Sequence, residues 1–149
     1  MLRRLATAAL ASFLIACTTP HAARAIPENT PPMKLTIDLE QNPDIQFRID
    51  RFSVPEAARP ELEAAIHRST RFLRTQPGFL GHVVLERQND TSGYNLMTVA
   101  AWESPDALEK AGAEARAYYE RIGVDVPALL SRLGVKMERG NYRAPLALQ

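Results

Sequence analysis

YNLMTVAAWESPDAL, residues 94–108, is the stretch that decides the fold of this chain. Its first nine residues are rich in β-branched and aromatic side chains, so they predict a strand. Ser104, Pro105 and Asp106 then combine a hydroxyl cap, a proline suited to a first turn and an acid at the positive end of a helix. A strand that passes directly into a helix is therefore expected here.

A second β-rich run lies just upstream, at residues 79–87, and the polar turn 89–93 joins it to the run that ends at Trp102. The two runs predict a hairpin. Both carry apolar residues on both faces, so neither face is expected to meet water. Farther upstream, Ser53 and Glu56 have the spacing of a capping box, and an amphipathic helix is predicted from there to Pro77-Gly78.

The remaining elements follow from the same kind of pattern. Residues 45–52 place Ile45, Phe47 and Ile49 on one side of a strand. The helix that starts at Ser104 has a natural stop at Gly123, and a short helical segment follows at 125–133. Residues 134–143 are the last strand candidate. The order strand, helix, strand, strand, helix, strand predicts an α+β, ferredoxin-like fold with a four-stranded antiparallel sheet.

In such a fold the helices cover only one face of the sheet. The other face would still carry apolar side chains and would need a partner. Two sheets that pack face to face would bury it, which predicts a homodimer in the form of a dimeric α/β barrel.

The first 25 residues have the composition of a signal peptide: a basic start, about a dozen apolar or small residues, and Ala23-Arg24-Ala25 as a cleavage pattern. Residues 14–17, Leu-Ile-Ala-Cys, also resemble a bacterial lipobox, in which Cys17 would be lipidated. Both alternatives predict export to the periplasm or cell envelope, and the second adds a lipid anchor as the only contact with a membrane. Residues 26–44 are a Pro-rich linker in which 33–39 alternate as in a short extra strand, and 144–149 are a tail.

Composition excludes several functional classes. The net charge is +1, and without the first 25 residues it is −2, so no nucleic-acid partner is expected. Cys17 is the only cysteine, and the three histidines lack the spacing of metal ligands, so neither a disulfide nor a metal site is predicted. There is also no Gly-rich phosphate loop and no nucleophile elbow.

Two segments resemble the antibiotic biosynthesis monooxygenase family: residues 71–81, RFLRTQPGFLG, and residues 98–108, TVAAWESPDAL. The resemblance covers roughly residues 45–143. It implies a pocket between the helices and the sheet of each subunit. It also implies one of two activities, cofactor-independent oxidation of electron-rich phenols or haem degradation.

The haem-degrading branch of this family uses an Asn, a Trp and a His. Trp102 matches the Trp, and Asp50 lies about where the Asn is expected. Gly112 stands where the His would fall, so haem cleavage of that type is not expected. The resemblance therefore favours a domain without a cofactor.

Asp50, His82 and Trp102 are the candidate catalytic residues: the first two would handle a proton and Trp102 would shape the pocket. Each also has an alternative structural interpretation. Asp50 could be a salt-bridged strand residue, His82 a hydrogen-bonded histidine in the sheet or dimer interface, and Trp102 a residue that fills the core. The candidates for contact with the substrate are Phe72, Tyr94, Asn95 and Tyr118.

The sequence thus favours a cofactor-independent monooxygenase that acts on a small aromatic or quinol-like compound in the cell envelope. The alternative is a non-catalytic, dimeric binding module for an apolar ligand or haem.

Overall fold

The computed structural model describes residues 35–88 and 93–148. They form four strands, three α-helices and two 3-10 turns, in the order β1 (Gln46–Ser53), η1 (Glu56–Ala58), α1 (Arg59–Leu73), β2 (Phe79–Glu86), β3 (Leu96–Trp102), α2 (Pro105–Arg121), α3 (Val126–Arg132), β4 (Lys136–Arg143) and η2 (Leu146–Leu148). The predicted order of elements is confirmed. Within the described ranges, no helix combines the length and the apolar character that a membrane crossing requires.

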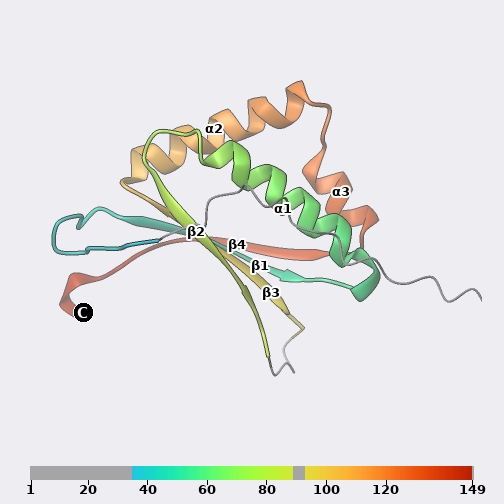
Figure 1. Cartoon of the computed structure of the whole chain (residues 1–149), viewed down its shortest axis with the longest axis horizontal. Helices are drawn as coiled ribbons and strands as arrows, with labels where there is room; N and C mark the ends of the chain where they lie inside the picture. Colours follow the sequence, from blue (N-terminus) through green and yellow to red (C-terminus); the bar gives the residue numbers. More distant parts are fainter. Residues whose placement is uncertain (1–34, 89–92, 149) are drawn as a thin grey trace, which may run out of the picture. The chain divides into compact units, whose positions relative to one another are not determined.

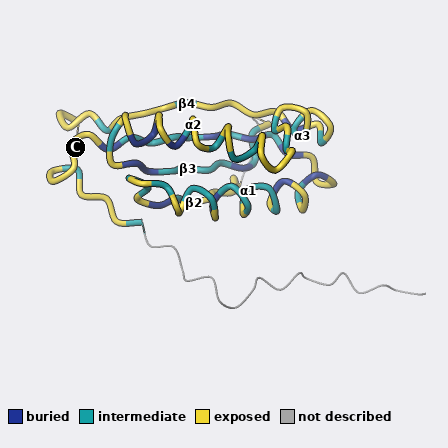
Figure 2. Tube along the Cα trace, turned by 90° about the horizontal axis from the view of Figure 1, so that it is seen from above, coloured by how far each residue is buried: buried dark blue, intermediate teal, exposed yellow. Residues whose placement is uncertain are grey.

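The four strands form one antiparallel sheet in the order β2-β3-β1-β4. The helices lie together on one side of it (Figure 1). Viewed from above, α2 runs over the side of the sheet that holds β4, and α1 runs over the side that holds β2 (Figure 2). This is the predicted ferredoxin-like α+β fold.

The strand register divides the side chains between two faces, because successive residues of a strand point to opposite sides. Phe52 contacts the helices through its apolar cluster, so the residues that share its side form the helix face. In β1 these are Gln46, Arg48, Asp50 and Phe52. The opposite side, here called the open face, carries Phe47, Ile49, Val83, Leu85, Met97, Val99 and Tyr142.

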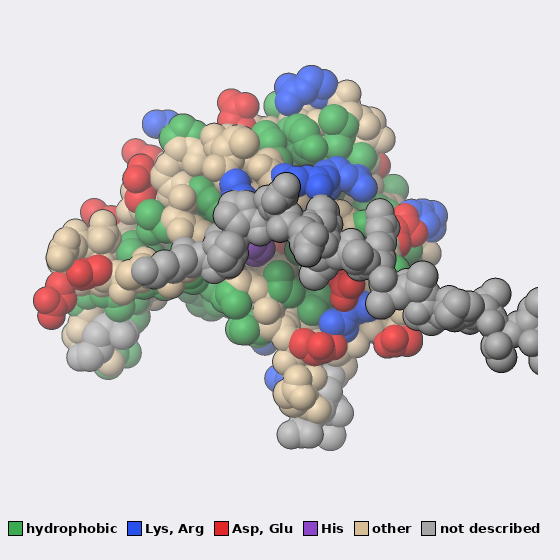
Figure 3. All heavy atoms as spheres, in the orientation of Figure 1, with side chains coloured by type: hydrophobic (Ala, Val, Ile, Leu, Met, Phe, Trp, Pro, Cys, Tyr) green, Lys and Arg blue, Asp and Glu red, His purple; other side chains and the backbone are tan. Residues whose placement is uncertain are grey.

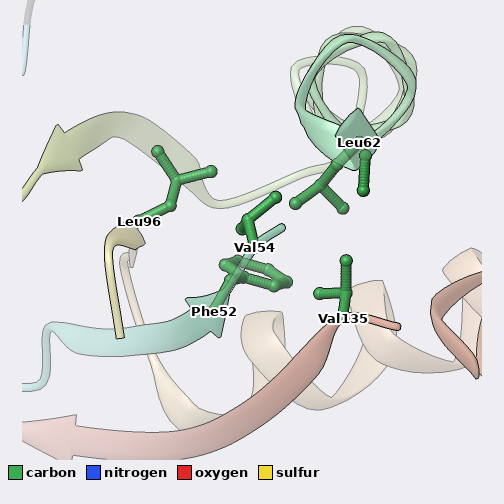
Figure 4. Packing of buried hydrophobic residues seen from close by; sticks show 6 residues of the cluster. Phe52, Val54, Leu62, Leu96 and Val135 are labelled. Atoms are coloured by element: carbon green, nitrogen blue, oxygen red, sulfur yellow. The ribbon is translucent and has the colours of Figure 1, made fainter. Parts of the chain in front are cut away.

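The core consists of two separate apolar clusters between the helices and the sheet. The first contains Phe52, Val54, Ala58, Leu62, Leu96 and Val135. Figure 4 shows its side chains converging from β1, β3, α1 and the start of β4. The second contains Trp102, Ala107, Leu108 and Ala111, with Leu73, Phe79 and Ala100 packed against it. Burial of these apolar side chains is the main stabilising contribution to the fold.

The predicted start of α2 is confirmed. The Ser104 side chain accepts a hydrogen bond of 3.1 Å from the backbone N–H of Ala107, and Pro105 occupies the first turn. The capping box predicted at Ser53 and Glu56 is wrong. Ser53 remains in β1, and η1 begins without a side-chain cap because the chain completes its strand pairing before it turns into a helix.

Three other expectations concern the edges of the domain. The first 34 residues, with Cys17 and the signal peptide, lie outside the described residues. Residues 35–39 form no strand. The expectation that neither face of the hairpin meets water fails for β2 in the single chain, where Val83, Val84 and Leu85 are all exposed, because β2 is an edge strand.

Candidate functional site

Polar side chains separate the two apolar clusters of the core. On the sheet, the cross-strand rows Asp50–Thr98 and Arg48–Ala100 lie between Phe52 of the first cluster and Trp102 of the second. Along α1, Ser69 and Thr70 likewise follow Leu62 and precede Leu73. We call this region the polar cluster; its members are Arg48, Asp50, Ser69, Thr70, His82, Tyr119, Arg139 and Asn141. A protein interior gains nothing from such groups unless they are paired or functional, so this is the candidate site.

Asp50 lies at the centre of the polar cluster and is only 9% exposed. Both of its carboxylate oxygens accept hydrogen bonds from Arg139 on the neighbouring strand, at 2.7 Å from Nε and 2.8 Å from Nη2. This fork-to-fork geometry is the strongest form of ion pair that proteins make. The hydrogen bonds that Arg139 donates to Asp50 raise the pKa of Arg139 above its ordinary value.

Arg48 lies in the cross-strand row next to that of Asp50. Its guanidinium is cationic and forms no ion pair with a carboxylate of the described residues. Its Nε donates a 3.2 Å hydrogen bond to the side-chain oxygen of Asn141. Burial, followed by repulsion from Arg139, lowers the pKa of Arg48, and Arg116 acts in the same direction. Asp50 opposes this effect, but its oxygens are already taken by Arg139.

A cavity of about 440 Å³ opens between α2 and the β1/β4 half of the sheet. Its lining consists of Gln46, Arg48, Pro105, Leu108, Glu109, Gly112, Arg116 and Asn141. It lies between the helices and the sheet, where the family resemblance implies a pocket. None of the seven domain residues chosen from the sequence lines it.

His82 lies on the helix face of β2, half-buried below α1. Its Nε2 is 3.3 Å from the Thr70 hydroxyl, and Thr70 is one of the two buried polar residues of the described ranges. Burial lowers the pKa of His82 below its ordinary value, and the positive charges of Arg74 and His67 lower it further. The ring is therefore neutral at pH 7 and can accept a proton.

Trp102 is 2% exposed and packs edge-on against Phe79, with 5.1 Å between the ring centroids. Its core position agrees with the structural interpretation. However, its indole N–H meets no acceptor among the residues that the structure describes. A buried donor without a partner costs about 1–3 kcal/mol, so this N–H is suited to an oxygen from outside the chain.

Aromatic side chains join the two long helices beside the polar cluster. Phe72 of α1 stacks on Tyr118 of α2 at 4.4 Å, and the Arg121 guanidinium lies 5.9 Å from the centroid of the Tyr118 ring. Tyr119 turns inward, where its hydroxyl is hydrogen-bonded to Ser69. Phe72 and Tyr118 thus each cover one face of the other's ring.

Tyr94 and Asn95 lie away from the cavity, at the other end of the sheet. The Asn95 side chain accepts a 3.0 Å hydrogen bond from the N–H of Val54 and donates a 2.9 Å bond to its carbonyl oxygen. The guanidinium of Arg51 lies 5.4 Å from the centroid of the Tyr94 ring. The structure gives both residues a role in joining β1 to the start of β3, and it does not bring them to the polar cluster.

The sequence interpretation missed Arg48, Arg116, Arg139 and Asn141. A signal was present, because Gln46, Arg48 and Asp50 alternate along β1 and so share one face. That alternation was interpreted through its apolar partners, Phe47 and Ile49, as if they faced the helices. Polar residues on the covered face were the less expected arrangement.

No group of histidine, cysteine or acidic side chains within residues 35–88 and 93–148 has the arrangement of a metal site. Figure 3 shows both acidic and basic side chains over the helices, with hydrophobic side chains at the surface between them. This mixture gives no support for a nucleic-acid surface.

Comparison with known protein families finds one that resembles this chain. Residues 46–116 match the family model described as antibiotic biosynthesis monooxygenase (ABM). This stretch, just under half of the chain, is thus similar to an ABM domain. The match spans β1 to most of α2, so it includes Arg48, Asp50, His82 and Trp102 of the site. No curated protein matches the chain.

Solved structures agree with this ABM assignment. SnoaB, a cofactor-independent oxygenase from Streptomyces nogalater, is 27% identical with a TM-score of 0.52, and the match covers 68% of this chain and 94% of SnoaB. An MhuD mutant with manganese protoporphyrin IX is 23% identical, with a TM-score of 0.51 over 68% and 95% of the two chains; MhuD is the haem degrader of Mycobacterium tuberculosis. A conserved protein from Methanosarcina mazei is 16% identical, with a TM-score of 0.52 over 72% and 100%.

The residues of this ABM-like domain do not fit a haem held through a ligand on α2. A Cβ atom at Gly112 would lie 3.7 Å from Nη1 of Arg48 and 3.9 Å from Nη1 of Arg116. The place that the resemblance gives to a histidine ligand thus faces two guanidinium groups, which stay protonated and cannot bind iron. A haem consequently finds no histidine ligand at this position of α2.

Proposed function

We propose that this domain is a cofactor-independent oxygenase that oxidises a small, electron-rich aromatic compound, a phenol or quinol, in the cell envelope. The observation that carries the proposal is the polar cluster between two apolar clusters, in a domain 27% identical to the oxygenase SnoaB. The signal peptide predicted for residues 1–25 is the support for the location. The chemistry requires three things from the protein: a proton acceptor, stabilisation of an anion and a place free of bulk water.

His82 is the proton acceptor. It is neutral at pH 7 because burial, and to a smaller extent the nearby Arg74 and His67 side chains, lower its pKa. A phenol gives up its proton to a neutral imidazole far more readily than to the Asp50 carboxylate, whose two oxygens both accept hydrogen bonds from Arg139. Thr70, 3.3 Å from Nε2, orients the ring.

Arg48 stabilises the anion that results. It is a half-buried cation on the same face of the sheet, and Ala100 separates it from His82 in the cross-strand row. The side chain between acceptor and cation, Ala100, is small and packs against the second apolar cluster.

The electrons for the reaction come from the substrate. The deprotonated ring transfers an electron to O₂, and recombination forms a carbon–oxygen bond. When a ring CH₂ becomes a carbonyl, one oxygen atom stays in the product and the other leaves as water with the two hydrogens. The four electrons lost by the carbon equal those gained by O₂, so no cofactor is needed. The protein supplies orientation, a proton acceptor and a dry environment.

Oxygen uptake with dithranol, a 1,8-dihydroxyanthrone that has such a CH₂ group, tests the proposal. We expect uptake above the spontaneous rate, and a loss of roughly 10²–10⁴-fold in kcat/KM for His82→Ala. Thr75→Ala, on an exposed residue at the end of α1, is the control. Binding of dithranol without uptake would favour the binding module instead, and equal rates for the wild type and His82→Ala would remove His82 from the mechanism.

The open face of the sheet is a further part of the proposal: a second copy of the chain covers it. The face carries seven large apolar side chains, among them Val83, Leu85 and Tyr142, which are exposed in the single chain. Apolar surface of this kind is rarely left in water. Because the face is a sheet, a second sheet of the same kind fits it, as in a dimeric α/β barrel.

A further inference from the structure

The cavity beside the polar cluster carries more positive charge than Arg48, the one cation that the proposed oxidation uses, supplies by itself. Its lining includes two arginines, Arg48 from β1 and Arg116 from α2, and one acid, Glu109. Within residues 35–88 and 93–148, neither arginine has a carboxylate within 4 Å. Arg139, which is also close, is neutralised by Asp50. The lining therefore carries one uncompensated positive charge.

The two arginines converge on a single point above the sheet. That point is the position a Cβ atom would occupy at Gly112, because Nη1 of each guanidinium lies within 4 Å of it. Any other residue at 112 would place a side chain there. The missing side chain leaves open space between two donors that are close enough for one carboxylate to accept a hydrogen bond from each.

The pKa of Arg48 indicates the same imbalance independently of the cavity. It is lowered by burial, by Arg139 and by Arg116. Three cations near one paired acid repel one another, and a bound anion would relieve this repulsion. Glu109, the one acid of the lining, forms no ion pair within 4 Å with either Arg48 or Arg116.

We propose that the space between Arg48 and Arg116, over Gly112, binds the carboxylate of an aromatic acid. The substrate class rests on the proposed oxygenase function: the substrate is an aromatic compound that carries a carboxylate, which this pair of arginines holds while the ring lies in the rest of the cavity. One net charge matches a carboxylate better than a phosphate dianion. Leu108 and Pro105, which also line the cavity, contact the apolar part of the ligand.

Binding of rhein, a 1,8-dihydroxyanthraquinone with one carboxylate, tests the inference without any turnover. Its methyl ester has nearly the same shape and lacks the charge. By isothermal titration calorimetry with the purified full chain, we expect rhein to bind at least tenfold more tightly than the ester. Arg48→Gln and Arg116→Gln should each abolish most of this preference. Lys110→Gln, which removes a cation of α2 outside this cavity, should retain it.

Arg116 is exposed, so its substitution is not expected to disturb folding even if that of half-buried Arg48 does. Equal affinity for rhein and its ester, or a preference that survives Arg116→Gln, would overturn the inference. The oxygenase proposal would be unaffected, because dithranol has no carboxylate. Conversely, a preference for rhein without any dithranol oxidation would leave the anion site standing and remove the reaction.

Discussion

The two faces of the sheet differ in an unexpected way: charged residues lie among the core residues of the covered face, and the open face is apolar apart from the ion pair of Arg51 with Glu138. The face that the helices cover carries Arg48, Asp50 and Arg139, whereas the open face carries Phe47, Ile49 and their apolar neighbours. In an ordinary antiparallel sheet the covered face is apolar and the uncovered face is polar. The difference supports the proposal that the covered face holds a site as well as a core, and that a second copy covers the open face.

The largest expected effect comes from placing a charge on the open face. Val83 and Val84 are adjacent in β2, and they are 37% and 42% exposed, yet they point to opposite faces. If a second copy covers the open face, Val83→Lys buries a charge in the interface and raises the dimer dissociation constant by more than 100-fold, while Val84→Lys does not. Light scattering after size-exclusion chromatography measures both.

The two lysine variants differ only in which face receives the charge, so each serves as the control for the other. Equal loss of dimer in both, or a wild-type chain that is monomeric at all concentrations, would show that the two faces do not differ in this way.

The next effect concerns the ion pair on the covered face. Asp50 is buried, whereas the side chain of Arg139 is 49% exposed. Arg139→Gln leaves a buried carboxylate without its partner, but after Asp50→Asn the guanidinium can turn toward water. We therefore expect Arg139→Gln to lower the free energy of unfolding by about 2–4 kcal/mol and Asp50→Asn to lower it by about 1–2 kcal/mol. Urea denaturation gives both values, and the reverse order would contradict this account of the pair.

A smaller effect follows from the lowered pKa of His82. In the unfolded chain the ring takes up a proton near pH 6.5, whereas in the folded domain it does so only at lower pH. The unfolded state thus binds more protons between these two pH values, so the stability present above pH 6.5 decreases as the pH falls toward the folded pKa. His82→Gln should remove this part of the pH dependence, as measured by urea denaturation at several pH values.

His82 also sets the pH profile of catalysis. If it is the proton acceptor, the acidic limb of kcat/KM has its midpoint below pH 6.5. If the acidic limb of kcat/KM has its midpoint at or above pH 6.5, or if the limb persists in the His82→Gln variant, a group other than His82 is responsible for it.

The fold could be predicted from sequence because its signals are local. Ser104-Pro105-Asp106 begins α2, and Pro77-Gly78 ends the α1 region, through contacts within a few residues of each other. The capping box at Ser53 failed because β4 competes for that residue through pairing across more than 80 positions. Sequence patterns record local preferences, and they do not record which of two local structures the rest of the sheet favours.

The site was predictable only in part, for the same reason. Asp50, His82 and Trp102 were visible as unusual residues in apolar runs, and all three lie on the helix face. Arg139 could not be assigned from sequence because its partner is 89 residues away. The cavity depends on Gly112, whose importance comes from the arginines around it and not from its own stretch of helix.

The smallest expected effect in this comparison of the two faces comes from the substitution Gly112→Ala. Glycine within a helix costs about 0.5–1 kcal/mol relative to alanine, so the substitution should raise the free energy of unfolding by that amount. The new methyl group would meet the two guanidinium groups at ordinary van der Waals distances, so the unliganded domain accommodates it.

The methyl group of Gly112→Ala would, however, occupy the space proposed for a carboxylate. Rhein should therefore bind more weakly, while its methyl ester loses less affinity. Ala113→Gly, the reverse exchange at the next position of α2, should lower stability and leave rhein binding unchanged. A Gly112→Ala variant that is more stable and binds rhein as tightly as the wild type would mean that glycine is present at 112 for a reason other than the ligand.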